Sequence, residues 1–200
     1  MLFVFLCCLF VFLGMFIARR FNLKYISISF MFGLFLINCL IQILPSSYNT
    51  LNINYHSTTF IYVFLGIVIG VVSMMLFDYK SDNCDDISII GFSLINTYIL
   101  CSNLSKINLI IFIVNAIYYF SIGVYIKDGK SWISVFIGMI LGIIISTIES
   151  WVIGYIFAII FGIIVCFVYS ISIVVMNRRC KYSNLFLIFG MLVAWLGCVL

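Results

Sequence analysis

Charged residues are scarce in this sequence. Only 8% of its 200 residues are Asp, Glu, Lys or Arg, whereas 66% are hydrophobic and the mean hydropathy is +1.34. A soluble domain of this length needs a charged shell to face water, and six acidic and ten basic residues are too few to make one. The composition therefore excludes the usual soluble globular classes and indicates that lipid is the solvent.

Catalytic and metal-binding motifs are missing as well. Histidine and proline occur once each, as His56 and Pro45, and the eight cysteines include no Cys-x-x-Cys pair. No Gly-x-Ser-x-Gly, His-Glu-x-x-His or paired-Asp motif supplies a nucleophile, a bound metal or an acid–base pair. We therefore expect neither an enzyme nor a resident cofactor, and the scattered cysteines predict neither a disulfide framework nor a zinc ribbon.

What the sequence does contain is a series of long apolar runs. A bilayer core about 30 Å thick needs roughly 20 apolar residues per helix, and these runs lack the alternation of barrel strands. Glu149 and Ser150 mark a turn that divides one overlong stretch into two runs. The sequence predicts an all-α fold, a single transmembrane domain over residues 1–200. Its eight predicted membrane-spanning helices are residues 1–18, 26–45, 58–77, 87–102, 108–126, 131–148, 151–176 and 184–200.

The distribution of basic residues predicts how these helices are oriented. Of the ten Lys and Arg residues, only Lys106 lies in an even-numbered connection. By the positive-inside rule the odd-numbered connections are cytoplasmic, so both termini lie outside the cytoplasm, and we expect an integral protein of the plasma membrane. Because the basic residues sit singly or in small groups between apolar runs, we expect no nucleic-acid partner. The nine basic residues of the odd-numbered connections are Arg19, Arg20, Lys24, Lys80, Lys127, Lys130, Arg178, Arg179 and Lys181.

The layout and one local stretch resemble the ZIP family of divalent-metal transporters. The local similarity covers residues 14–47, GMFIARRFNLKYISISFMFGLFLINCLIQILPSS, in which Gln42 and Pro45 stand where the second ZIP helix ends in a His-Leu-Leu-Pro-Glu type sequence. The resemblance implies a ZIP-like bundle of eight helices with both ends outside the cytoplasm. It also implies a divalent cation such as zinc as the transported solute. The lipid bilayer, a divalent metal ion and a homodimer are the candidate partners.

The same resemblance indicates candidate metal ligands. ZIP proteins build their metal site from His, Asn and acidic residues of the fourth and fifth helices, and alignment on Gly91 places Asp86, Asn115 and Tyr119 at or near ligand positions. Glu149 is similar to an acidic residue of the sixth helix. We therefore take Asp86, Asn115 and Glu149 as the candidate metal ligands. Zinc prefers imidazole, thiolate and carboxylate, so this set is a degenerate version of the family's site.

Polar side chains inside the apolar runs are the other candidates for a functional site. Asn38, Gln42, Asn96 and Asn115 are amides that need hydrogen-bond partners in hydrocarbon, so they should face the bundle. They are either structural, each interhelical hydrogen bond contributing about 0.6 to 2 kcal/mol, or part of a substrate pathway. Helix capping is an alternative for Asp86, and an interfacial position is one for Glu149. The predicted pathway residues are Gln42, Asn38, Asp86, Asn96, Asn115, Tyr119 and Glu149.

Two functions follow from these features. The first is a membrane transporter that resembles ZIP permeases and moves one helix bundle against another. The second is a transport-incompetent relative that acts as a membrane scaffold or regulatory subunit, which the missing ligands favour. A manganese-exporter type of fold is a rival within the transporter class, because residues 146–154, STIESWVIG, resemble its Ser-x-Asp-Ala helix; that family has six spans.

Overall fold

The computed structural model contains only helices and turns in the residues that it describes, which confirms the predicted all-α class. The described residues are 2–20, 24–80, 84–102, 109–126, 132–148, 151–177 and 183–199. A π-helical segment, η1 (Cys39–Ile43), follows α2, and a 3₁₀ turn, η2 (His56–Thr58), follows α3. The α-helices are α1 (Leu2–Arg20), α2 (Lys24–Asn38), α3 (Leu44–Tyr55), α4 (Thr59–Lys80), α5 (Cys84–Ser102), α6 (Leu109–Ile126), α7 (Trp132–Ser146), α8 (Val152–Asn177) and α9 (Ser183–Val199).

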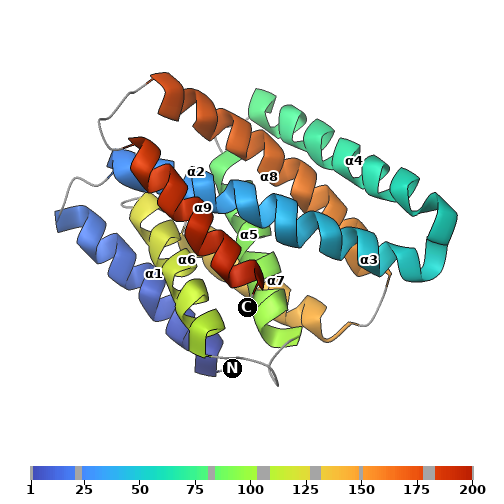
Figure 1. The fold of residues 1–200 in the computed structure, drawn as a ribbon, viewed down its shortest axis with the longest axis horizontal. Coiled ribbons are helices and arrows are strands. Elements are labelled where there is room, and N and C mark those ends of the chain that lie inside the picture. Colours follow the sequence, from blue (N-terminus) through green and yellow to red (C-terminus); the bar gives the residue numbers. More distant parts are fainter. Residues whose placement is uncertain are drawn as a thin grey trace.

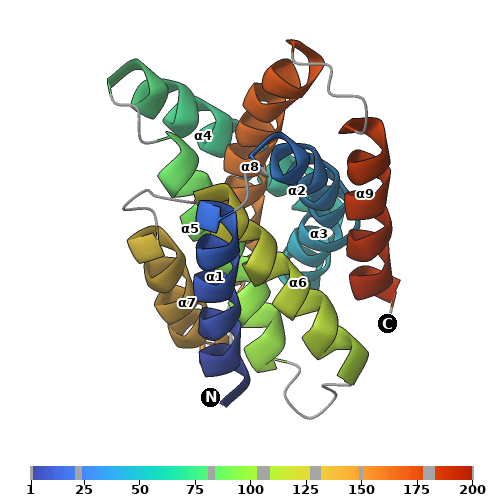
Figure 2. The same ribbon diagram turned by 90° about the vertical axis from the view of Figure 1, so that its left-hand side faces the viewer.

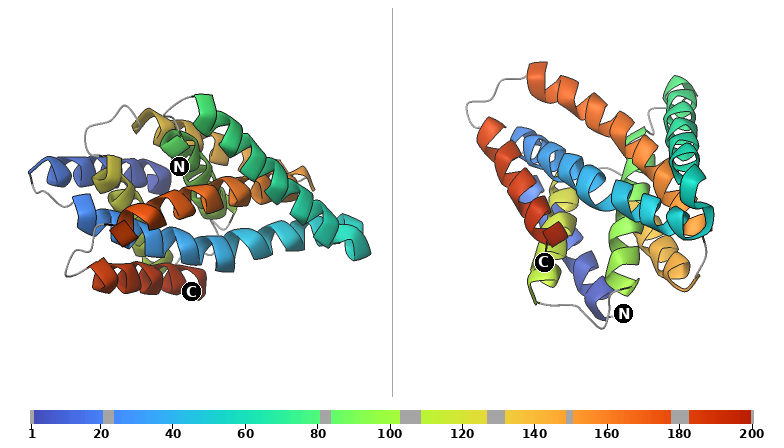
Figure 3. Two further views of the ribbon diagram at one scale, coloured as in Figure 1. Left: turned by 90° about the horizontal axis from the view of Figure 1, so that it is seen from above. Right: turned by 45° about the vertical axis from the view of Figure 1, so that its right-hand side comes forward.

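Pro45 does not end the second helical run, so this part of the sequence prediction is wrong. The helix continues from α2 through η1 into α3 and ends only at Tyr55 (Figure 3), and Pro45 lies in the first turn of α3. Proline lacks an N–H group and its ring crowds the carbonyl four residues earlier. In η1 the hydrogen bonds reach five residues back, as from the Leu44 N–H to the Cys39 carbonyl. The wider turn gives the proline ring the room that a regular helix denies it.

Four pairs of helices make the most extensive contacts, namely α1 with α6, α2 with α9, α4 with α8, and α5 with α7. Glycines let the backbones of each pair approach closely. A Cβ atom on Gly66 would lie 2.5 Å from the Cβ of Ala158, and one on Gly142 would lie 2.8 Å from the Cβ of Thr97. Such close approach gives dense van der Waals contact, the main attraction between helices in a bilayer.

The helices of the pairs α4/α8 and α5/α7 run in the same direction. In α4 and α8, Tyr62 packs against Tyr155, with ring centroids 5.6 Å apart, and two turns further along both helices Gly70 meets Gly162. In α5 and α7, Gly138 lies against the Ile90 carbonyl and Gly142, one turn later, against the Leu94 carbonyl. Parallel neighbours that are not consecutive in sequence require an intervening helix to return the chain, as an up-and-down bundle does.

Side-chain hydrogen bonds link the four pairs into two groups, although the backbones of α5 and α6 also pack against α8, α2 and α9 of the other group. In the first, the Tyr119 hydroxyl of α6 lies 2.7 Å from the Thr97 Oγ1 of α5, and the Cys8 Sγ of α1 donates to the Met139 Sδ of α7 at 3.3 Å. In the second, the Ser47 Oγ of α3 donates to the Gly154 carbonyl of α8 at 2.9 Å. We call the set α1, α5, α6 and α7 group A, the set α2, α3, α4, α8 and α9 group B, and the surface between them the seam (Figures 1 and 2).

The contact pattern contains an internal two-fold relation. In this relation α1 corresponds to α7, α2–α3 to α8, α4 to α9, and α5 to α6. The pair α1/α6 then corresponds to the pair α7/α5, and the pair α2/α9 to the pair α8/α4. Contacts across the seam obey the same correspondence, since the contact of α5 with α8 has its counterpart in the contact of α6 with α2. Helices α1 and α7 run in opposite directions, because Cys8 meets Met139 while Phe12 meets Phe136. The two related halves are therefore inverted with respect to each other, an arrangement found in many transporters.

The outer surface of the described helices is apolar. Ile53 and Phe60 are 73% and 72% exposed, and many further large apolar side chains also face outward. By length and composition, two of the described helical runs pass as membrane-spanning, Ser27–Leu76 and Val152–Ile173, and four apolar helices are shorter. Helix α1 begins and helix α9 ends at the same end of the molecule (Figure 2).

Candidate functional site at the seam

Six of the seven predicted pathway residues fall within the described part of the chain, and Glu149 lies outside it. Asn38 is the last residue of α2 and Gln42 lies in η1, both in group B. Asp86 and Asn96 belong to α5, and Asn115 and Tyr119 to α6, all in group A. The predicted residues therefore come from both sides of the seam.

Tyr119 and Asn96 take part in structural hydrogen bonds. The fully buried Tyr119 hydroxyl contacts both the Thr97 Oγ1 at 2.7 Å and the Ser93 carbonyl at 3.2 Å, which ties α6 to α5. The Asn96 Nδ2 donates to the Phe92 carbonyl within its own helix at 2.9 Å. For these two residues the geometry favours the structural alternative. Sequence reasoning missed Ser93 and Thr97, although the spacing of Ser93, Asn96 and Thr97 puts three polar side chains on one side of a helix.

Asn38 differs from the other amides. Its side chain is completely buried, and neither its Nδ2 nor its Oδ1 has a hydrogen-bond partner in the part of the chain that the structure describes. Leaving a buried polar atom unpaired costs about 1 to 3 kcal/mol. A native fold keeps such a cost where the group has a function, or where a bound molecule supplies the partner.

A cluster of aromatic rings closes the seam one helical turn from Asn38. The ring of Phe35 on α2 lies 4.1 Å from that of Phe92 on α5 and 5.4 Å from that of Phe167 on α8, measured between centroids. All three side chains are fully buried. The rings of Phe35 and Phe92 thus join group A to group B beside the unpaired amide.

Helix α5 begins at Cys84, so Asp86 lies inside its first turn. Asp86 is therefore not the capping residue that precedes the helix. Its Oδ1 is buried and has no hydrogen-bond partner among the described residues. A carboxylate in this position is stabilised by the helix dipole, which is positive at the amino end. Asp86 therefore remains an acidic candidate at one end of helix α5.

The described residues do not form a zinc-type cluster. No group of three or more His, Cys, Asp or Glu side chains comes together within the described ranges. Asn115 is buried on α6, and His56 is exposed in η2, where its φ of 37° gives the chain a tight turn. The donors brought toward the seam are mainly neutral amides and hydroxyls, which bind zinc poorly.

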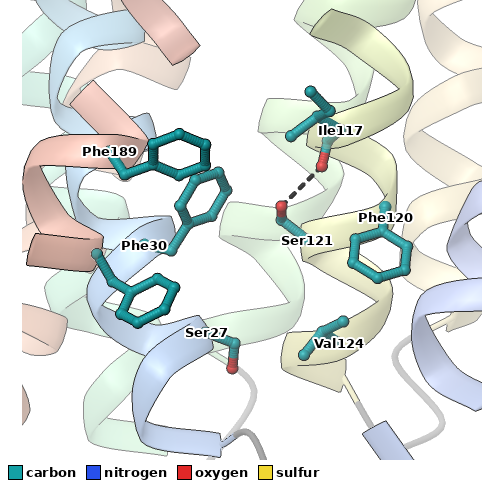
Figure 4. A pocket seen from close by; sticks show the side chains of 8 residues that line it. Ser27, Phe30, Ile117, Phe120, Ser121, Val124 and Phe189 are labelled. Atoms are coloured by element: carbon teal, nitrogen blue, oxygen red, sulfur yellow. Dashed lines mark hydrogen bonds between the residues drawn. The ribbon is translucent and has the colours of Figure 1, made fainter. Parts of the chain in front are cut away.

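An apolar groove opens at the surface of the seam between α2, α6 and α9 (Figure 4). Its volume is about 320 Å³. The Ser121 Oγ donates to the Ile117 carbonyl of its own helix at 2.7 Å, so the proton of this hydroxyl is not available to a ligand. The lining suits hydrocarbon rather than a polar solute. It consists of Ser27, Phe30, Ile117, Phe120, Ser121, Val124, Phe186 and Phe189.

Comparison with known proteins gives no assignment. The chain matches no protein-family model and no curated protein. Its class is defined here by structure, as an all-α protein of paired helices related by an internal inversion.

Proposed function

We propose that the chain is an integral membrane transporter with an eight-span, ZIP-like arrangement, in which group A and group B move against each other to pass a small solute. The inverted relation between the two halves is the observation that carries this proposal. Inverted halves can exchange conformations, which opens a central site first to one side of the membrane and then to the other.

The membrane setting is supported by surface and charge together. The outward-facing side chains of the described helices are large and apolar, as hydrocarbon requires, and soluble monomers rarely expose apolar patches of this extent. The Lys and Arg distribution favours cytoplasmic odd-numbered connections and two termini outside the cytoplasm. A plasma-membrane location is part of the proposal.

The proposed movement is supported by the kind of contact on each side of the seam. Hydrogen bonds such as Tyr119 to Thr97 and Ser47 to Gly154 tie helices within each group. Contacts across the seam include the rings of Phe35 and Phe92. A long hydrogen bond from the Tyr118 hydroxyl of α6 to the Ala194 carbonyl of α9, at 3.5 Å, also crosses the seam. Ring contacts can separate without exposing an unpaired polar group, so the part of the seam at Phe35 and Phe92 opens at lower cost than a part made of hydrogen bonds.

The ZIP resemblance implies a divalent cation, with Asp86, Asn115 and Glu149 as its ligands, whereas the neutral donors of the described seam also allow an uncharged solute. The test is flux into proteoliposomes that contain the purified chain and an indicator for Zn²⁺ or Mn²⁺. Metal influx above that of protein-free liposomes supports a metal substrate. If neither metals nor small uncharged solutes cross faster than in protein-free liposomes, the transport proposal fails.

A membrane scaffold or regulatory subunit is the second candidate. It is favoured by the hydrogen bonds of Tyr119 and Asn96, which give two of the predicted pathway residues a structural role. A scaffold should copurify with a defined partner from mild detergent. A chain that purifies without a stoichiometric partner and supports solute flux excludes this alternative.

A further inference from the structure

The unpaired amide of Asn38 carries more information than its burial alone. Asn38 is the last residue before η1, and π-helical segments inside α-helices occur frequently at functional sites. Pro45 has no N–H group, so the Ile41 carbonyl, one turn beyond Asn38, lacks the donor that a regular helix would supply. The helix is thus irregular at the place where its buried amide has no partner.

The chemistry of the amide restricts what can satisfy it. The Asn38 Oδ1 accepts hydrogen bonds, and the Nδ2 donates them. A bare cation would bind the Oδ1 and repel the Nδ2–H groups, whereas an anion would satisfy only the Nδ2. Both atoms are unpaired within the described helices. Only a molecule that donates and accepts hydrogen bonds satisfies the two atoms together.

We propose that Asn38 is the solute-binding residue of the seam, and that its ligand is a small uncharged molecule that both donates and accepts hydrogen bonds, such as a polyol or an amide. This inference rests on the proposed transport function and names its substrate class. Phe35, one turn before Asn38 on the same helix, packs against Phe92 across the seam, so separation of the two groups at these rings would open the seam within one turn of the amide. The substrate therefore differs from the divalent cation that the ZIP resemblance implies.

The experiment measures flux of named solutes through the purified full chain in proteoliposomes. Glycerol and urea entry is followed by stopped-flow light scattering, and Zn²⁺ entry by an enclosed indicator. Asn38→Leu removes both hydrogen-bonding atoms at similar volume, and Asn38→Asp keeps the acceptor and removes the donor. Ser121→Ala is the matched control, because that hydroxyl bonds only to its own helix in the described contacts.

We expect glycerol or urea to enter faster through the wild-type chain and Ser121→Ala than through protein-free liposomes. Asn38→Leu should reduce the protein-dependent rate about tenfold or more, and Asn38→Asp should also reduce it, since each lost hydrogen bond to a buried group weakens binding by roughly an order of magnitude. Melting of Asn38→Leu at or above the wild-type temperature shows that the loss is not due to misfolding.

Four results would overturn the inference. Uncharged flux that is unchanged in Asn38→Leu would remove Asn38 from the site, with the transport proposal intact. Zn²⁺ flux with no uncharged flux, or water permeation that excludes glycerol and urea, would assign the site to a cation or to a structural water. Absence of all solute flux in the folded wild-type chain would reject the transport proposal itself and the inference with it.

Discussion

The ring of Phe35 on α2 lies edge-on to the ring of Phe92 on α5, with their centroids 4.1 Å apart, and this contact joins the two groups of helices. Phe167 packs against Phe35 from α8, so the closure is built from three rings. Edge-to-face aromatic contacts add about 0.5 to 1.5 kcal/mol each beyond the area that they bury. Ring contacts of this strength can hold the seam closed in one conformation, and thermal motion can still separate them.

The first prediction concerns this contact. In a chain without its native cysteines, a short thiol-reactive cross-linker applied to Phe35→Cys combined with Phe92→Cys should lock the seam. We expect solute flux in proteoliposomes to fall to the protein-free level and to return when the linker is cleaved. The reason is that the linker holds group A against group B.

The matched control is a pair of rings within one group. Phe30 and Phe189 lie on α2 and α9 with their centroids 5.8 Å apart, and both helices belong to group B. Cross-linking Phe30→Cys to Phe189→Cys should leave flux unchanged. If both linked pairs block flux, or neither does, the two groups do not move as separate bodies.

The second prediction separates structural from pathway roles for Tyr119. Tyr119→Phe and Thr97→Val each remove one side of the hydrogen bond between α6 and α5. In a double-mutant cycle we expect a coupling of about 0.6 to 1.7 kcal/mol in the free energy of unfolding, as measured for hydrogen bonds between membrane helices. Flux per folded molecule should stay near that of the wild type. A large loss of flux in Tyr119→Phe at unchanged stability would return this residue to the pathway.

The third prediction concerns packing of α5 against α7. Gly142→Leu forces a large side chain toward Thr97, whose Cβ would lie 2.8 Å from even the first added carbon. We expect a loss of about 1 to 3 kcal/mol in stability, with a lower melting temperature in detergent. Ile140→Leu is the control on the same helix, because Ile140 is 56% exposed and the change should be nearly neutral. Equal melting of both variants would contradict the close approach of α5 and α7.

Helix positions were largely predictable because long apolar runs follow a simple rule. Every backbone polar group in lipid must be satisfied within its own helix, so long apolar runs become helices. The predicted division of this stretch into two helices is confirmed, since α7 ends at Ser146 and α8 begins at Val152, while Glu149 and Ser150 themselves lie outside the described residues. Pro45 was misread, because a π-helical segment that accommodates proline leaves no clear mark in the sequence.

The pairing of helices and the state of each polar residue were beyond the sequence. Asn38 and Asn96 are the same residue type in similar apolar surroundings, yet Asn96 bonds to its own helix and Asn38 has no partner among the described residues. The difference comes from rotamers and neighbouring helices. Likewise, Tyr119 forms its hydrogen bond with Thr97, which lies 22 positions earlier in the chain, and no local pattern in the sequence indicates that partner.

The central claim is that the chain threads the bilayer as a bundle with both ends on the outer side. It is tested most directly with an impermeant thiol reagent on intact cells that express single-cysteine variants of a cysteine-free chain. We predict that Ser57→Cys, in the exposed turn η2, reacts in intact cells, that Asp128→Cys reacts only after permeabilisation, and that tags at both termini are reached from outside. Tags on opposite sides of the membrane, or a chain that stays dissolved without detergent, would contradict the account.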